Sequence, residues 1–156
     1  MKKLFYFLLI YGILFSRSKF KFGVNTSLLY EDGKAYPVIG VTGSYSPYRF
    51  LTIEGKGEYI MKDYQKEFAF PLTLDFMYPQ KYFSPYVGLG LCYNYYQSSI
   101  SKSSSLGYRF KGGIKFFDKK DASMYFETSY DVPDLFKGKG RWYFTGKVDK
   151  NFELEF

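Results

Sequence analysis

Apolar and polar residues alternate along most of this chain. The clearest stretch is EFAFPLTLDFMY, from Glu67 to Tyr78, in which every even position from Phe68 onward is apolar or aromatic, while the odd positions include Asp75. A period of two is typical of a strand whose two faces lie in unlike surroundings. The stretch is longer than the usual strand of about 5–6 residues. It predicts a long strand with one apolar face and one polar face.

The same alternation recurs through the chain. It predicts strands over residues 19–30, 37–46, 50–61, 67–78, 85–96, 106–117, 123–131 and 141–156. Asp32-Gly33 is a strong hairpin signal, and the Ser-rich run 97–105 and the segment 132–140 are typical of loops. We expect the first, third, fifth and seventh connections to contain the longer loops and the others to be tight. Eight strands joined in this way predict an antiparallel up-and-down sheet that closes into a barrel.

The direction of the apolar face decides the class of barrel. Its large side chains are too many for the interior of an eight-stranded barrel, which side chains only just fill. The other face carries small residues such as Gly23, Gly40 and Gly88 beside charged residues of both signs, which suits a narrow lumen. The strands are also long enough to cross a bilayer at a tilt. We therefore predict an all-β fold, an eight-stranded antiparallel up-and-down transmembrane β-barrel with its apolar face turned to lipid.

The N-terminal segment has a different pattern. Lys2 and Lys3 precede an apolar run from Leu4 to Phe15, which is too short for a membrane-spanning helix and typical of a secretory signal peptide. We expect a signal peptide over residues 1–18 and a barrel over 19–156. An uncleaved anchor or a buried helix stays open, because no A-x-A site precedes the first strand.

Composition narrows the function classes. The chain has a formal net charge of +7 and 24% aromatic residues. Part of that positive charge lies in the expected signal peptide and the rest is spread over many segments, so nucleic-acid binding is disfavoured. The single cysteine, Cys92, cannot form an internal disulfide.

Histidine is absent, which excludes Ser-His nucleophiles and His-ligated metal sites. Two carboxylate pairs, Glu54 with Glu58 and Asp149 with Glu153, share a strand face and could act as an acid and a base. Ion pairing with neighbouring lysine and arginine is the simpler interpretation. We expect no enzyme activity, no metal and no cofactor.

Charged side chains on the predicted inward face form the candidate site. The expected lumen ion-pair network consists of Lys21, Glu54, Lys56, Glu58, Asp75, Arg109, Lys111, Lys115, Glu127, Asp131, Lys147, Asp149 and Glu153. The expected partners are Arg109 with Asp131, Glu127 with Lys111, Lys115 and Lys147, and Lys21 with Glu153. Buried charges need such pairing, because removing one partner of a buried pair costs about 3–5 kcal/mol.

Three segments together resemble a known group. The signal-like start, SPYVGLGLCYNYY over residues 84–96 and the final KNFELEF are similar to the small eight-stranded bacterial outer-membrane barrels of the OmpA, OmpX and OmpW type. The resemblance implies a monomer in the outer membrane. It also implies that the barrel-assembly machinery reads Phe152, Leu154 and Phe156.

Three functions stay open at this stage. The first is a structural or surface-interaction barrel with a charge-filled, non-conducting lumen. Such a barrel would contact outer-membrane lipid and lipopolysaccharide phosphates through Lys62, Lys66, Lys102, Lys137, Lys139 and Arg141. The second, implied by the likeness to OmpW, is a narrow channel for small or apolar solutes. The third is a soluble lipocalin-like carrier.

Overall fold

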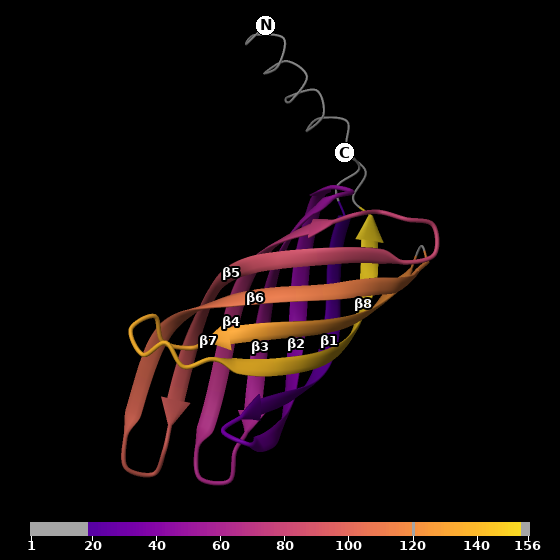
Figure 1. Ribbon diagram of the computed structural model, residues 1–156. Coiled ribbons are helices and arrows are strands. Elements are labelled where there is room, and N and C mark those ends of the chain that lie inside the picture. Colours follow the sequence, from indigo (N-terminus) through magenta and orange to yellow (C-terminus); the bar gives the residue numbers. More distant parts are fainter. Residues whose placement is uncertain (1–18, 120, 154–156) are drawn as a thin grey trace, which may run out of the picture.

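The computed structural model describes residues 19–119 and 121–153, and all regular elements in these ranges are β-strands. They are β1 (Lys19–Glu31), β2 (Lys34–Tyr48), β3 (Leu51–Met61), β4 (Lys66–Met77), β5 (Ser84–Gln97), β6 (Lys102–Asp118), β7 (Ala122–Val132) and β8 (Arg141–Glu153). Each strand pairs antiparallel with the next, and β1 also pairs with β8, so the sheet closes (Figure 1). The predicted eight-stranded up-and-down barrel is confirmed. The expected signal peptide, residues 1–18, lies outside the described residues.

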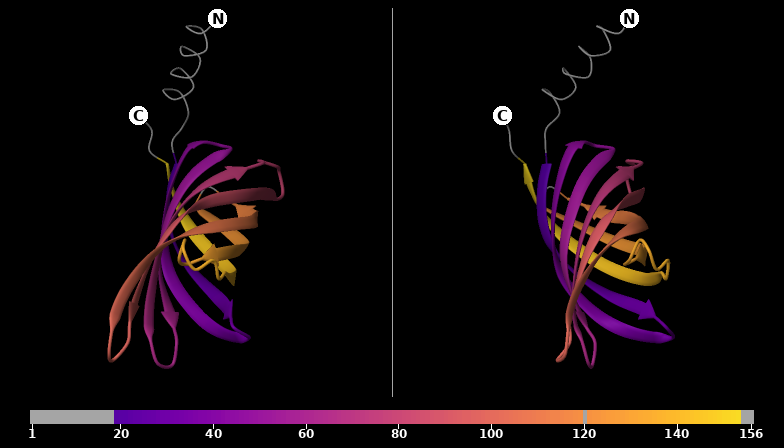
Figure 2. Two further views of the ribbon diagram at one scale, coloured as in Figure 1. Left: turned by 60° about the vertical axis from the view of Figure 1, so that its left-hand side comes forward. Right: turned by 90° about the vertical axis from the view of Figure 1, so that its left-hand side faces the viewer.

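The barrel has two unlike ends. The terminal end holds the start of β1, the end of β8 and the connections after β2, β4 and β6. The loop end holds the connections 32–33, 62–65, 98–101 and 133–140. The β3–β4 and β5–β6 hairpins project together at the loop end (Figures 1 and 2). Among the described residues, no helix is long and apolar enough to cross a membrane.

The expected contrast between long loops and tight turns is confirmed for the seventh connection, 133–140, which is the longest, but it is wrong for the fourth and fifth connections. The Ser-rich run was expected to be a loop, but only residues 98–101 connect β5 to β6, and Lys102 to Ser105 pair with Gln97 to Asn94. At the terminal end, the connection 78–83 is longer than the connection 62–65. A strand that extends beyond an apolar belt has water on its outer face, so backbone pairing continues there without alternating side chains. Periodicity therefore marks where the belt ends and not where the strand ends.

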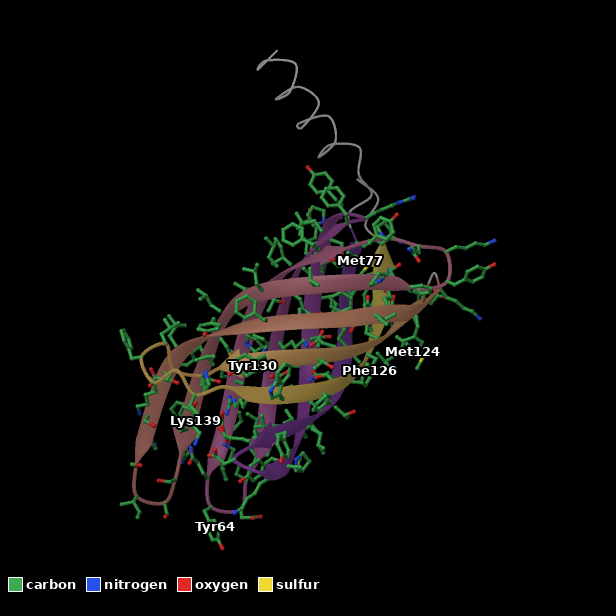
Figure 3. The ribbon with its side chains drawn as sticks, in the orientation of Figure 1. Tyr64, Met77, Met124, Phe126, Tyr130 and Lys139 are labelled. Carbon is green, nitrogen blue, oxygen red and sulfur yellow. The ribbon has the colours of Figure 1, made fainter. Side chains whose placement is uncertain are left out.

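The outward face of the barrel is apolar. Phe22, Val41, Leu72 and Val87 are each 58–64% exposed, and Phe126 of β7 points away from the barrel (Figure 3). A continuous apolar belt of this kind in water would promote association, whereas in a bilayer it contacts acyl chains. The barrel is thus built to span a membrane. The lipocalin-like alternative is disfavoured, because the interior is polar.

Glycine is needed at two kinds of position, one for a positive φ and the other for close packing. The β1–β2 turn has φ of 51° at Asp32 and 77° at Gly33, the pair of positive values that a two-residue hairpin of type I′ needs. On the inward face, a Cβ on Gly23 would lie 2.2 Å from Asp149 Oδ1. The second kind of glycine leaves the lumen wide enough for charged side chains.

Candidate functional site

The inward face of the barrel carries the predicted charged set. Lys21, Glu54, Lys56, Glu58, Asp75, Arg109, Lys111, Glu127, Asp131, Lys147 and Asp149 are all buried in the lumen. Lys115 is half-buried toward the terminal end, and the side chain of Glu153 lies outside the described ones. The buried charges gather in two groups, which we call the lysine cluster and the arginine cluster.

The lysine cluster is centred on Glu54 of β3. Its members are Glu54, Lys56, Asp75, Lys111, Glu127 and Lys147. Glu54 accepts hydrogen bonds from Lys111 Nζ, at 2.6 Å, and from Lys147 Nζ, and it lies 3.4 Å from Lys56 Nζ. One carboxylate thus faces three ammonium groups that come from β3, β6 and β8.

The other two carboxylates of this cluster, Glu127 and Asp75, pair with the same lysines. Glu127 accepts hydrogen bonds from Lys56 and, at 2.7 Å, from the hydroxyl of Tyr86. Asp75 pairs with Lys111 at 2.8 Å. Asp149 adds a fourth carboxylate, 3.6 Å from Lys147. Every buried charge of this group thus has an oppositely charged neighbour, which is the condition under which buried ions are tolerated.

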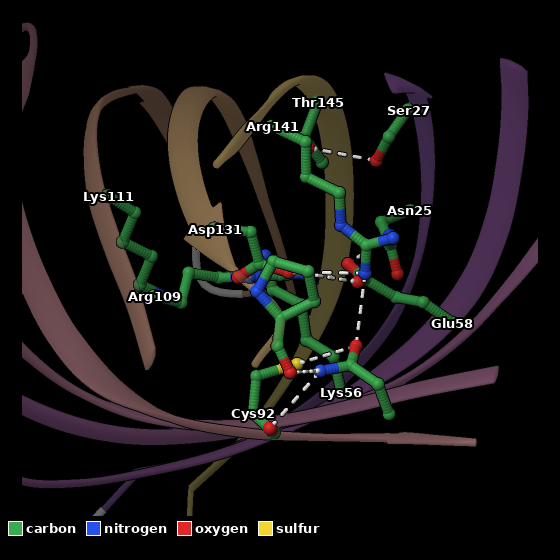
Figure 4. A network of polar contacts seen from close by, with 12 residues as sticks. Asn25, Ser27, Lys56, Glu58, Cys92, Arg109, Lys111, Asp131, Arg141 and Thr145 are labelled. Carbon is green, nitrogen blue, oxygen red and sulfur yellow. Dashed lines mark hydrogen bonds and ion pairs between the residues drawn. The ribbon is translucent and has the colours of Figure 1, made fainter. Parts of the chain in front are cut away.

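The arginine cluster lies nearer the loop end. Its members are Glu58, Glu67, Arg109, Asp131 and Arg141, of which Figure 4 labels all but Glu67. Arg109 donates from Nε to Asp131 Oδ1 at 2.8 Å and from Nη2 to Asp131 Oδ2 at 3.2 Å. Its Nη2 also lies 2.9 Å from Glu58 Oε2. The planar guanidinium thereby holds two carboxylates of different strands.

Arg141, the first residue of β8, is the second arginine of the cluster. It forms an ion pair with Glu67 and donates to Asn94 Oδ1 at 3.0 Å. Its Nη2 lies 3.6 Å from Asp131 Oδ2. Tyr143 supports both arginines, because the guanidinium carbons lie 4.4 Å (Arg109) and 5.6 Å (Arg141) from the centre of its ring.

Lys62 connects the arginine cluster to the rim at the loop end. Its ammonium lies 2.8 Å from Glu67 Oε2 and donates to Glu31 Oε2 at 2.5 Å. Partial burial acts to lower the pKa of Lys62, but the carboxylates of Glu67 and Glu31 outweigh it, so the pKa is raised above the ordinary lysine value. Lys62, Arg109 and Arg141 thus pair with four carboxylates, those of Glu31, Glu58, Glu67 and Asp131.

An apolar layer lies in the lumen beside the arginine cluster. It is made of Leu29, Val38, Ile60, Ala69, Cys92 and Tyr143, each at most 1% exposed. The alternation of apolar and polar residues did not predict this layer. The signal was a break in the alternation, since Leu28-Leu29-Tyr30 and Tyr59-Ile60-Met61 are consecutive apolar residues and both faces of those strands are therefore apolar.

The expected ion-pair partners are brought together in part. Arg109 meets Asp131, and Glu127 lies 3.7 Å from Lys111. Other placements differ from expectation. Lys147 contacts Glu54 and Asp149 instead of Glu127, and Lys21 donates to the Tyr125 hydroxyl at 2.7 Å. In the β1–β8 register Lys21 is opposite Asn151, while Glu153 is opposite Lys19.

The residues expected to contact lipopolysaccharide do not all lie on the surface. Lys66, Lys102, Lys137 and Lys139 are exposed at the loop end, whereas Lys62 is partly buried in the rim. The expectation for Arg141 is wrong, because its side chain is 1% exposed and enclosed in the lumen. Arg141 shares the parity of Tyr143 and Thr145, so it opens β8 on the inward face, where carboxylates surround it.

The expected assembly signal lies at the end of β8. Phe152 is on the outward face and 42% exposed. Leu154 and Phe156 lie outside the described residues. Recognition of these three residues by the barrel-assembly machinery stays a prediction.

Catalytic chemistry finds little support in these contacts. Glu54 and Glu58 are both buried and held by lysine or arginine, so neither resembles a carboxylate poised for acid–base work. Cys92 is buried in the apolar layer. Within residues 19–119 and 121–153, no group of three or more Cys, Asp or Glu side chains is arranged to hold a metal ion.

Comparison with known proteins gives structural likenesses alone. No protein-family model and no curated protein sequence matches the chain. Neisserial surface protein A is similar, with a TM-score of 0.69 and 12% identity over 88% of this chain and 98% of that one. The N-terminal β-barrel domain of OprF from Pseudomonas aeruginosa has a TM-score of 0.68 and 14% identity over 85% and 97%.

The outer membrane enzyme PagL is a more distant likeness, with a TM-score of 0.50 and 12% identity over 81% of this chain and 97% of that one. The fold by itself therefore does not separate enzymes from other barrels. The closed eight-stranded sheet, its apolar belt and these likenesses agree: the chain has the fold of the small bacterial outer-membrane β-barrels.

Proposed function

We propose that this protein is an outer-membrane barrel with a closed, non-conducting lumen that serves a structural or surface-interaction role. The observation that carries the proposal is the filling of the lumen by two clusters of paired opposite charges and one apolar layer. Opposite charges within 4 Å attract by about 4 kcal/mol at the effective dielectric near a protein surface, and more strongly in a drier interior. Thermal motion rarely separates several such pairs together, so the lumen stays closed to a continuous column of water.

Conductance in a planar lipid bilayer tests this proposal. The wild-type barrel should show no steady ohmic current. Glu127→Ala removes a carboxylate that pairs with both Lys56 and Lys111, so these two ammonium groups repel each other more strongly. We therefore expect brief small openings or a less stable barrel. Lys66→Ala, an exposed change on the same barrel, should match the wild type.

A stable and reproducible wild-type conductance would overturn the closed lumen. The narrow channel for small or apolar solutes would then become the leading function. The protein added to the membrane has to be folded, and a shift in gel mobility on boiling, expected of a closed strand ladder, provides that check.

We also propose that exposed lysines at the loop end contact lipopolysaccharide phosphates. Lys137 and Lys139 have side chains 82% and 70% exposed, and they lie 3.8 Å from Asp134 and 2.6 Å from Asp32 respectively. These exposed pairs are weak, so a phosphate can compete for the ammonium groups. Replacing both lysines by Gln should weaken lipopolysaccharide binding and reduce its salt dependence. The control is Lys81→Gln at the terminal end, which should bind as the wild type does. Equal binding by the double variant and this control would contradict the proposed contact.

A further inference from the structure

Three apolar side chains stand out at the loop end. Tyr64, Ile100 and Phe136 are 93%, 95% and 97% exposed, the highest values among large hydrophobic residues in the described chain. Each lies in a different connection, after β3, β5 and β7 respectively. The next value is 77%, for Tyr82 at the terminal end. Single exposed apolar residues are ordinary, but one at the tip of each of three loops at the same end is a pattern.

The loop that carries Ile100 is ordered by its own hydrogen bonds. Ser98 N donates to the Ser101 carbonyl at 2.9 Å, and Ser101 N donates to Ser98 Oγ at 3.0 Å. These bonds satisfy the N–H groups of Ser98 and Ser101 within the turn itself, without contacts to the barrel. The Ile100 side chain is therefore held outward in a defined turn.

The loop that carries Phe136 is ordered in a similar way by Asp134. Phe136 N donates to Asp134 Oδ1 at 2.9 Å, and Lys137 N and Gly138 N donate to the Asp134 carbonyl at 3.2 and 3.4 Å. Gly138 takes a φ of 64°, which allows the chain to reverse there. The turn presents the ring of Phe136 to solvent.

The β3–β4 loop is fixed at its base. Lys62 is bound to Glu31 and Glu67, while Tyr64 extends from the tip of the hairpin away from the barrel (Figure 3). All three loops thus combine a base held by polar contacts with an apolar residue left in solvent. Preordered tips lose little conformational entropy when they bind.

The charge at this end is positive. The exposed charged residues there are Lys34, Lys66, Lys102, Lys137 and Lys139 against Asp32 and Asp63. Apolar and aromatic groups surrounded by lysine are typical of segments that bind at the interface of an anionic bilayer.

We propose that the loop end docks on an anionic lipid bilayer other than the one that the barrel spans. Tyr64, Ile100 and Phe136 enter the interface of that second bilayer, and the surrounding lysines contact its phosphates. This inference extends the surface-interaction part of the proposed function and assumes that the loop end projects from the spanned membrane. It does not depend on whether the lumen conducts.

A bilayer fits these tips better than a protein partner does. Protein interfaces concentrate their binding energy in a contiguous apolar centre surrounded by a polar rim. Here the apolar residues are on three separate loops. Their neighbours in sequence are polar, such as Asp63, Ser101 and Lys137, except for Leu135 beside Phe136, which is 44% exposed. A fluid lipid interface accepts separate insertions, because lipids rearrange around each one.

Vesicle co-flotation tests the docking. The barrel is held in phosphatidylcholine nanodiscs and mixed with vesicles of phosphatidylcholine alone or with phosphatidylglycerol added. We expect binding to the anionic vesicles, weakened by salt, and a loss of at least about tenfold in the Tyr64→Ser, Ile100→Ser, Phe136→Ser triple variant. Tyr82→Ser, an exposed aromatic change at the terminal end, should bind as the wild type does. Absence of binding, or equal binding by the triple variant, would overturn the proposal.

Fluorescence quenching separates insertion from charge attraction alone. The chain contains one tryptophan, Trp142, so a Trp142→Phe, Phe136→Trp variant reports from the loop tip. Brominated lipid placed only in the vesicles should quench this tryptophan on binding. Bound but unquenched protein would exclude insertion. A conducting wild-type barrel, by contrast, would contradict the closed lumen and leave this result intact.

Discussion

The two charged clusters of the lumen solve the same problem in different ways. In the lysine cluster, one carboxylate, Glu54, is shared by three flexible ammonium groups. An ammonium group is a point charge, so its contact with Glu54 does not orient its contact with a second carboxylate. In the arginine cluster, the guanidinium of Arg109 holds Asp131 through two N–H groups and Glu58 through a third contact. The comparison shows that paired lysine and carboxylate side chains can fill a lumen. Planar arginine donors also determine which side chains of different strands meet.

The side chains that surround the two clusters also differ in polarity. Two tyrosines lie beside the lysine cluster: the Tyr86 hydroxyl donates to Glu127, and Lys147 lies 4.1 Å from the centre of the Tyr125 ring. The arginine cluster instead lies against the apolar layer, with Tyr143 between its two arginines. We therefore expect the arginine cluster to tolerate the loss of a member less well.

The largest expected effect comes from removing Arg109. Arg109→Ala leaves Glu58 and Asp131 buried without their main partner, so the free energy of unfolding should fall by about 3–5 kcal/mol. Lys56→Ala in the lysine cluster should cost about 1–3 kcal/mol, because Glu54 and Glu127 keep other lysine neighbours. Urea unfolding in micelles, followed by Trp142 fluorescence, measures both values. Equal losses would show that the two clusters do not differ as their geometry indicates.

A smaller effect is expected from a methyl group added beside the lysine cluster. In Gly88→Ala the new Cβ would lie 2.2 Å from Asp75 Oδ1 and 2.8 Å from Lys111 Cε. Both side chains have to shift, which should cost about 1–3 kcal/mol.

Gly57→Ala on the outward face is the matched control for this change. Its Cβ would meet side-chain atoms of Val41 and Phe70 at 3.7 and 3.8 Å, which is ordinary contact. Its unfolding free energy in the same assay should stay within about 0.5 kcal/mol of the wild type. A neutral Gly88→Ala would mean that the lysine cluster rearranges freely.

The smallest effect concerns Lys62, which joins the arginine cluster to the rim. Its pKa is raised in the folded protein, so its contribution is fully present below the unfolded lysine value of about 10.4 and is lost as pH rises through the folded value. The difference in unfolding free energy between wild type and Lys62→Met should be below about 1 kcal/mol near neutral pH and should shrink at strongly alkaline pH. A difference that grows with pH would contradict the assigned pairing with Glu67 and Glu31.

Sequence periodicity was sufficient for the fold because a strand repeats every two residues. The stretch from Glu67 to Tyr78 assigns each side chain to one face, and the bulk of the apolar face decides that it turns outward. The same parity puts Glu54, Arg109 and Glu127 in the lumen without knowledge of any partner. Adjacent strands also allowed one pair, Arg109 with Asp131, to be predicted from the hairpin register.

Contacts across the lumen depended on the closed tertiary structure. Lys111 of β6 meets Glu54 of β3, and Arg141 of β8 meets Glu67 of β4, although neither pair lies on adjacent strands. Such contacts depend on the shear and curvature of the whole barrel, to which no local pattern is sensitive. The sequence by itself thus determined the face of strand residues such as Glu54 and Arg109, and only the tertiary structure decided which charges meet. The face is a property of one strand, whereas proximity across a lumen is a property of all eight.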